Sequence, residues 1–149
     1  MNGYINAFLK YNIEPDVNLI KNCEPNIECA HDLFIELYGF KKNKTYTDFT
    51  AVLTVSDLLA MGIYEAAGKI GIKIPEDCSV IGYDNIFSSK YCFPPLTTIH
   101  QPKKRIGEKS IAILLKQLRD DSMKHEKIII EPELIIRESV VNLTNVRTI

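Results

Sequence analysis

Apolar positions in this chain switch repeatedly between a spacing of three and four and short continuous runs. The spacing of three and four predicts helices over residues 3–12, 25–39, 57–70 and 102–118. Apolar runs rich in β-branched residues predict strands over residues 49–55 and 78–83, and a strand or extended crossing over 96–100. VNLIKN, residues 17–22, predicts a short strand. A polar stretch over 119–127 precedes two further extended runs, 128–134 and 135–141, and Pro132 between them indicates an edge strand or a bend.

Alternating strands and helices predict the α/β class, with a doubly wound parallel sheet and flanking helices built from right-handed βαβ units. The expected strands are almost entirely apolar, which is typical of a sheet covered on both faces. Ligands of such sheets bind beyond the carboxyl ends of the strands. Ser56 follows one expected strand and Asp84 ends another. We therefore expect both residues at the same edge of the sheet, within two or three strand spacings of about 4.8 Å.

Composition and charge narrow the classes of function. The 149 residues include 46% hydrophobic and 25% charged residues, as in an ordinary globular protein, and the formal net charge is −1. No overall positive field draws the chain to nucleic acid or to an anionic membrane. The one basic run, residues 103–105, is typical of a solvated helix face. No segment has the length of a membrane span and no leader opens the chain, so we expect no membrane partner.

The four cysteines and three histidines are too dispersed to predict a metal centre. A structural zinc site needs four ligands, usually in two close pairs, and the closest approach to one is Cys29 with His31. Free thiols are typical of a reducing cytosol, and we expect them in a cytoplasmic protein here. The sequence contains no glycine-rich phosphate loop and no nucleophile paired with a base. We therefore expect no cofactor, and an enzyme is the weakest of the functional interpretations.

Five segments resemble one protein family in their order and spacing. They are GYINAFLKYNIEPDVNLI (3–20), AVLTVSDLLAMGIYEAAGKIGIKIPEDCSVIGYDNI (51–86), PPLTTIHQP (94–102), a helix with Gly107, and PELIIRESV (132–140). Together they resemble the C-terminal part of the lactose/galactose repressor family of bacterial transcription regulators. IGYDN and PPLTTIHQP are closest to the purine-repressor branch.

The resemblance implies a fold of the periplasmic-binding-protein type and a sensing function. Whole members carry a helix-turn-helix headpiece and a hinge before a core of two subdomains that binds an effector. Residues 1–95 correspond to the C-terminal subdomain, 96–124 to a crossover strand and helix of the other subdomain, and 125–149 to the returning strands and tail. We expect an effector-sensing and dimerisation part, a sugar or related metabolite as effector, a homo-oligomer, and DNA contact only through a headpiece outside this chain.

A solute-binding component of transport with the same fold is the alternative function. A signal peptide and lipobox upstream would identify it, whereas the RESV segment at residues 137–140 and the cysteine usage favour the regulator.

The resemblance also implies roles for residues at the sheet edge. Asp84 matches the effector-contacting aspartate of the family's G-[FY]-D motif, and an ionised carboxylate accepts hydrogen bonds from sugar hydroxyls or ring N–H groups. The alternative for Asp84 is the N-cap of the segment after Asn85. Ser56 stands where many relatives carry asparagine; its hydroxyl could donate to a ligand, or it is simply a small residue at a turn. We expect Asp57 to cap the following helix rather than bind a ligand.

Two further sites follow from the resemblance. Cys23 matches a pocket-facing position that is aromatic in purine-type relatives, and because cysteine cannot stack on a ring, purine recognition is disfavoured. A buried small hydrophobe is the alternative for Cys23. Tyr91, Cys92 and Phe93 lie in a loop that relatives use for dimer contacts, and we expect them at a dimer interface.

The helix over residues 102–118 carries an apolar stripe of Ile111, Leu114, Leu115 and Leu118. In relatives it packs on the other subdomain. In this chain we expect the stripe to pack against another copy, to exchange between protomers, or to fold back on its own sheet. Self-association is favoured, since a symmetric pair covers both stripes at once.

Overall fold

The computed structural model describes residues 2–39, 49–119 and 126–142 of the chain. Residues 120–125 of the expected polar stretch and 143–149 of the expected tail lie outside this part. The elements, in order, are α1 (Asn2–Lys10), the 3-10 helix η1 (Val17–Leu19), α2 (Ile27–Gly39), β1 (Ala51–Leu53), α3 (Asp57–Ile70), β2 (Ser79–Asp84), the 3-10 helix η2 (Phe87–Tyr91), β3 (Thr97–His100), α4 (Lys103–Arg119) and β4 (Glu133–Ile135).

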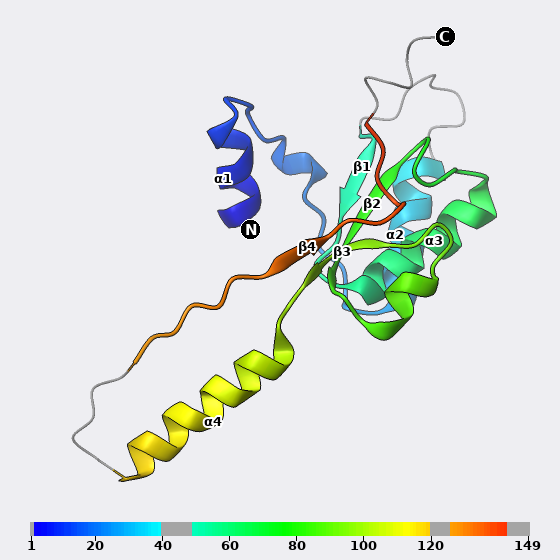
Figure 1. Ribbon diagram of the computed structural model, residues 1–149. Coiled ribbons are helices and arrows are strands. Elements are labelled where there is room, and N and C mark those ends of the chain that lie inside the picture. The colour runs from blue at the N-terminus through cyan, green and yellow to red at the C-terminus, as the bar shows by residue number, and fades with distance from the viewer. Residues whose placement is uncertain (1, 40–48, 120–125, 143–149) are drawn as a thin grey trace.

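The four strands form one sheet in the order β1–β2–β3–β4 (Figure 1). β1 pairs with β2 and β2 pairs with β3 in parallel, whereas β4 runs antiparallel to β3. The predicted α/β class is confirmed, as a parallel-dominated sheet flanked by helices. The antiparallel β4 is an edge strand that directly follows Pro132, in agreement with the rule that proline is tolerated at sheet edges.

The hydrophobic core lies where α2 and α3 pack together beside the sheet (Figure 1). Gly62 in α3 is required there, because a Cβ at this position would collide with the carbonyl oxygen of Ile27 at the start of α2. The α3 helix begins and ends with strong local signals: the Ser56 side chain caps it and Gly71, with a φ of 74°, closes it. The core side chains are Phe34, Tyr38, Ala60, Ile63, Ala66, Ala67, Cys78, Val80 and Leu96.

The C-terminal segment after β4 crosses back over the sheet and joins two strands through one buried serine. The Ser139 hydroxyl donates to the carbonyl oxygen of Val80 in β2 and accepts from the Thr97 N–H of β3, over 2.5 and 2.8 Å. The Ser139 carbonyl also accepts from the Val80 N–H at 2.8 Å. Ser139 is fully buried, so these bonds satisfy backbone groups that water cannot reach.

The expectation of a strand over residues 17–22 is wrong. Residues Val17–Leu19 form a 3-10 helix, because the Asp16 carboxylate accepts a hydrogen bond from the Asn18 N–H at 2.9 Å and the Ile20 N–H returns to the Val17 carbonyl. Val17 is 63% exposed. The apolar residues Val17, Leu19 and Ile20 belong to a local turn and do not pair with a neighbouring strand.

The α4 helix extends away from the rest of the fold (Figure 1). None of its residues is buried, and the stripe of Ile111, Leu114, Leu115 and Leu118 is 57%, 50%, 48% and 74% exposed. The helix therefore does not fold back on its own sheet, which removes one of the three expected outcomes for the stripe.

Candidate functional site

The carboxyl ends of β1, β2 and β3 meet at one edge of the sheet. Leu53 lies opposite Ile81, so the chain reaches Ser56 just beyond the end of β1, and Asp84 at the end of β2 lies opposite His100 in β3. Because β1 and β2 are immediate parallel neighbours, the prediction that Ser56 and Asp84 share one edge is confirmed. We call this the carboxyl edge.

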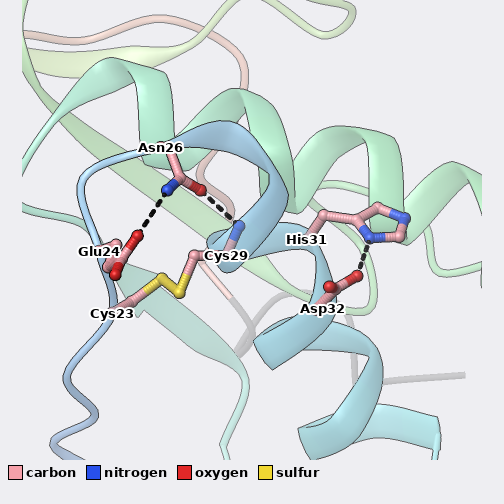
Figure 2. Close-up of a disulfide and its surroundings, with 6 residues drawn as sticks. All are labelled: Cys23, Glu24, Asn26, Cys29, His31 and Asp32. Atoms are coloured by element: carbon pink, nitrogen blue, oxygen red, sulfur yellow. Dashed lines mark hydrogen bonds and ion pairs between the residues drawn. A yellow bond between two sulfur atoms is a disulfide. The ribbon is translucent and has the colours of Figure 1, made fainter.

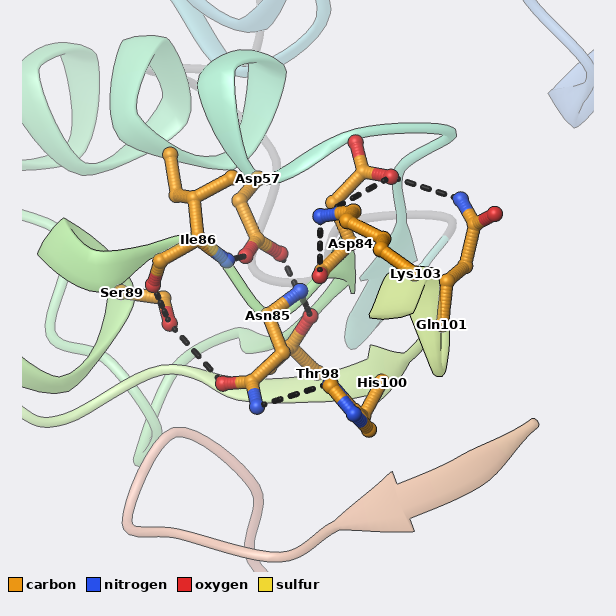
Figure 3. A network of polar contacts seen from close by, with 9 residues as sticks. All are labelled: Asp57, Asp84, Asn85, Ile86, Ser89, Thr98, His100, Gln101 and Lys103. Carbon is orange, nitrogen blue, oxygen red and sulfur yellow. Dashed lines mark hydrogen bonds and ion pairs between the residues drawn. The ribbon is translucent and has the colours of Figure 1, made fainter. Parts of the chain in front are cut away.

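Asp84 is held in an unusual conformation at the carboxyl edge (Figure 3). Its φ is 112°, and Asn85 follows with a φ of 50°, both in the region that L-residues rarely adopt. Gln101 donates to Asp84 Oδ1 at 2.7 Å, and the Lys103 ammonium donates to the Asp84 carbonyl oxygen at 2.8 Å. Lys103 Nζ also lies 4.0 Å from Oδ1. The Asp84 side chain is 29% exposed, and among the described residues no donor reaches its Oδ2.

Asp57 lies beneath this turn and is completely buried. Its carboxylate accepts hydrogen bonds from the Ile86 N–H at 2.8 Å and from the Thr98 hydroxyl. Gly82 makes room for it, since a Cβ at Gly82 would collide with Asp57 Oδ1. The expectation that Asp57 caps α3 is wrong: Ser56 is the N-cap, and its hydroxyl oxygen accepts from the Leu59 N–H at 3.4 Å.

Arg137, in the segment after β4, fixes the Asn85 side chain from the other side. One guanidinium nitrogen donates to Asn85 Oδ1 at 2.7 Å. The other donates to the Leu96 carbonyl oxygen at 2.6 Å and to Ser89 Oγ at 3.2 Å. Asn85 Nδ2 lies 3.3 Å from His100 Nδ1, so the polar network continues onto β3 (Figure 3).

An open groove begins beside Asp84 where α4 starts. It is lined by His100, Pro102, Lys103, Lys104, Arg105, Glu108 and Lys109. The interpretation of residues 103–105 as a plain solvated helix face is therefore incomplete, because Lys103 contacts Asp84 as well as solvent.

Cys23 does not carry a free thiol in the structure. It forms a disulfide with Cys29 in the first turn of α2, next to Asn26, whose side chain accepts from the Cys29 N–H at 2.7 Å (Figure 2). The expectation of free thiols is therefore wrong for Cys23 and Cys29 and holds for Cys78 and Cys92. A spacing of six residues alone does not predict such a pair, because it depends on how the chain enters the helix.

The loop with Tyr91, Cys92 and Phe93 presents exposed aromatic rings. Tyr91 and Phe93 are 66% and 95% exposed, whereas Cys92 is half-buried against the core. Phe87 is also exposed, and the Lys90 ammonium lies 4.5 Å from its ring centroid and 4.9 Å from that of Tyr91. The Phe87 and Tyr91 ring centroids lie 5.2 Å apart, and exposed apolar groups of this kind are typical of interaction surfaces.

Burial favours the neutral forms of two side chains, Cys92 and Tyr64. Burial raises the pKa of the Cys92 thiol above its ordinary 9.0, the Asp57 charge raises it further, and the Arg137 charge opposes the shift. Burial also raises the pKa of Tyr64, whose hydroxyl donates to the Pro94 carbonyl oxygen at 2.8 Å. Both side chains pack against the hydrophobic core, and their raised pKa values do not suit proton transfer at neutral pH.

Neither a metal centre nor a membrane span is found in the described ranges 2–39, 49–119 and 126–142. No three histidine, cysteine or acidic side chains there converge on a point that could hold a metal ion. No helix of this part is long and apolar enough to cross a membrane.

The sequence located Asp84 and missed most of its neighbours. Asn85, Thr98, Gln101 and Arg137 all belong to segments that carried the family resemblance, but nothing in their local pattern assigned them to the edge. Asn85, Thr98 and Gln101 share one signal, since each follows or lies within a strand that ends at the carboxyl edge. Arg137 lacks it, because β4 runs antiparallel and away from this edge.

Comparison with known proteins identifies the domain. The model of the periplasmic binding protein-like domain matches residues 2–140. The chain belongs to this family. The predicted resemblance to repressors is confirmed by two relatives, both HTH-type transcriptional repressors PurR. The one from Vibrio atlanticus is 40% identical over 150 residues, covering 96% of this chain and 41% of the relative. The one from Mannheimia succiniciproducens is 47% identical over 138 residues, covering 93% of this chain and 40% of the relative.

Two solved structures of similar fold are of transcription regulators. A LacI family transcriptional regulator from Enterococcus faecium with bound ribose has a TM-score of 0.79 at 29% identity, with 93% of this chain and 49% of that chain covered. A complex of the transcriptional regulator CelR with cellobiose has a TM-score of 0.81 at 26% identity, with 92% of this chain and 40% of that chain covered. Most of this chain aligns with these proteins, but the aligned part is only about two fifths to one half of their own length.

Proposed function

We propose that this chain is the effector-sensing part of a ligand-responsive transcription regulator and that its effector binds at the carboxyl edge. The observation that carries the proposal is Asp84, a part-exposed carboxylate at the end of a parallel strand with one oxygen already hydrogen-bonded and the other available. The similarity to repressors and to sugar-bound regulators supports the same function.

The chemistry of Asp84 fits an effector that donates hydrogen bonds. An ionised carboxylate only accepts, so it selects hydroxyl or N–H groups. Gln101 holds Oδ1 at 2.7 Å and so fixes the direction in which Oδ2 faces. Such a site suits a sugar or a related polar metabolite, and Cys23, bonded to Cys29, offers no ring of its own on which a purine could stack.

Sensing in this proposal needs no bond to be made or broken. An effector that binds one arrangement of two subdomains better than another shifts the population toward that arrangement. Residues 1–95 form the sensing subdomain, 96–124 the crossover to the other subdomain and 125–149 the return. The regulator works in the cytoplasm as a homo-oligomer, reaches DNA through a headpiece outside these residues and is not an enzyme.

Roles for the remaining predicted residues belong to the same proposal. Ser56 caps α3 through its oxygen and keeps its hydroxyl hydrogen for an effector, and Cys23 lies in the wall of the effector site. Tyr91, Cys92 and Phe93 contribute to a dimer interface, which the exposure of the two aromatic rings supports.

A thermal-shift screen tests the proposal. Ligands that bind only the folded state raise the melting temperature with concentration. We expect D-ribose, cellobiose or another polyol sugar to stabilise the wild-type chain, and we expect Asp84→Ala to remove that shift. Asp77→Ala is the matched control, because it also deletes a carboxylate but lies before the start of β2, away from the carboxyl edge. The Asp77 carboxylate accepts a hydrogen bond from the Lys73 N–H. An equal shift in Asp84→Ala and wild type would refute the assignment of Asp84.

A further inference from the structure

The backbone conformation of the turn at residues 84–86 is unfavourable in free energy, and Asp57 and Arg137, outside the turn, stabilise it. Asp84 and Asn85 both have positive φ, at 112° and 50°, although neither is glycine. Consecutive non-glycine residues in this region persist only where the surroundings determine their conformation.

Asp57 fixes the backbone of the turn. It accepts directly from the Ile86 N–H at 2.8 Å, and it accepts from the Thr98 hydroxyl, whose oxygen in turn accepts from the Asn85 N–H at 3.3 Å. Two successive backbone donors are thereby tied to one buried carboxylate. The approach of that carboxylate depends on Gly82, which leaves it room.

Arg137 fixes the side chain of the turn. Its guanidinium joins Asn85 Oδ1, Ser89 Oγ and the Leu96 carbonyl oxygen within 3.2 Å. A planar fork with several donors suits this arrangement, and an ammonium could not reproduce all three contacts. The turn is thus held from α3 on one side and from the segment after β4 on the other.

We infer that Asp57 and Arg137 are positioning residues that force the 84–86 turn into its left-handed conformation and thereby aim the Asp84 carboxylate out of the carboxyl edge. Neither residue needs to touch an effector. The consequence for binding rests on the proposed function of Asp84, but the conformation of the turn can be tested without any ligand.

The test is NMR spectroscopy on the 149-residue chain with Asp57→Asn and Arg137→Lys. Asparagine keeps the size of Asp57 but replaces one acceptor oxygen with a donor. We expect the backbone couplings that report positive φ at Asp84 and Asn85 to be lost in Asp57→Asn. We also expect the Ile86 amide to exchange with solvent about 10- to 150-fold faster, the factor for losing a hydrogen bond to a charged acceptor.

Matched variants separate positioning from general stability. Ile63→Val lowers stability from the same helix through the core and makes no polar contact with the turn, so its turn should keep wild-type couplings and relative exchange rates. If Asp57→Asn fails to fold, Thr98→Val and Thr98→Ser replace it: valine removes the connecting hydroxyl and should loosen Asn85, whereas serine keeps the hydroxyl and should restore it.

The two proposals fail in different ways. Wild-type couplings and exchange at residues 84–86 in both Asp57→Asn and Thr98→Val would overturn the positioning role of Asp57, and the same result in Arg137→Lys would overturn that of Arg137. Absence of binding by D-ribose, cellobiose and adenine to the wild type would instead count against the proposed function, while the turn measurements would still decide the role of Asp57 and Arg137.

Discussion

Exposure of the α4 stripe predicts that these 149 residues associate with a second copy through this helix. The perturbation that tests it is the double variant Leu114→Glu with Leu118→Glu. Since no residue of α4 is buried, the two charges should leave the fold of the remaining chain intact. They should abolish association, because each would have to be desolvated in an apolar contact.

The expected magnitude follows from the exposed fractions. The four stripe side chains together expose the equivalent of about 2.3 complete side chains, so covering them yields about 3–7 kcal/mol per copy at roughly 1.5–3 kcal/mol per side chain. A symmetric pair gains twice this amount and loses about 4 kcal/mol or more in freedom of motion on association. With a loss of about 4 kcal/mol the net gain is about 2–10 kcal/mol, which corresponds to a dissociation constant between roughly tens of nanomolar and tens of millimolar.

The dependence of association on ionic strength provides a second test of the prediction. The α4 helix carries six basic residues and one acidic residue, so two copies repel each other at low ionic strength. Screening shortens the range of that repulsion, and association should therefore strengthen as salt is added.

Sedimentation velocity over a concentration series is the assay, with circular dichroism to confirm that α4 stays helical. Lys104→Glu is the control, because it changes the net charge by the same two units as the double variant at a position whose side chain is 92% exposed, outside the stripe. A wild-type chain that remains monomeric at every concentration with α4 intact would refute the argument from exposed area.

Three further predictions concern stability, pH and redox state. Ser139→Ala should lower the free energy of unfolding in urea by about 1–3 kcal/mol, since it strands two buried backbone groups; a loss no larger than that of Val140→Ala would contradict this. The folded state holds the Cys92 proton more tightly than the unfolded state, because its pKa is raised above the ordinary 9.0. The contribution of this thiol to the free energy of unfolding should therefore be steady below pH 9.0 and fall as the pH rises through the folded pKa. Urea titrations from about pH 8 to about pH 10.5 should show a shallower fall in Cys92→Ala, and an unchanged slope would exclude this thiol as a cause. Thiol titration of the chain unfolded in denaturant without reductant should find two of the four cysteines free, whereas four free thiols would show that Cys23 and Cys29 are not bonded.

The predicted elements that agree with the structure are those with local determinants. The α3 helix has a serine cap, an apolar stripe and a closing glycine, and β2 is a continuous apolar run. Residues 17–22 also include apolar and β-branched residues but form no strand, because a strand needs a neighbour and the Asp16 side chain offers a local alternative. Pattern alone does not show which of the two outcomes is more stable.

At the candidate site, too, local sequence predicts some residues, whereas the roles of others depend on tertiary packing. The strand-end rule located Asp84 beside Ser56. The role of Asp57 was not predictable, because an aspartate at a helix start normally caps it, and only the packing of Gly82 against α3 shows that this carboxylate lies inward. Arg137 reaches Asn85 across 52 residues of sequence, a contact that no local pattern contains.

Binding at the carboxyl edge is tested most directly by mapping it with NMR spectroscopy. Amide shifts of the labelled 149-residue chain would be followed during titration with D-ribose, cellobiose and adenine, for the wild type and for Asp84→Ala. The account predicts that a hydrogen-bond-donating sugar shifts the amides of residues 84–86 and 98–101 and that Asp84→Ala weakens this binding by about 1.5–3 kcal/mol, or roughly 10- to 150-fold. Shifts confined to another surface, or the same affinity in Asp84→Ala, would contradict it.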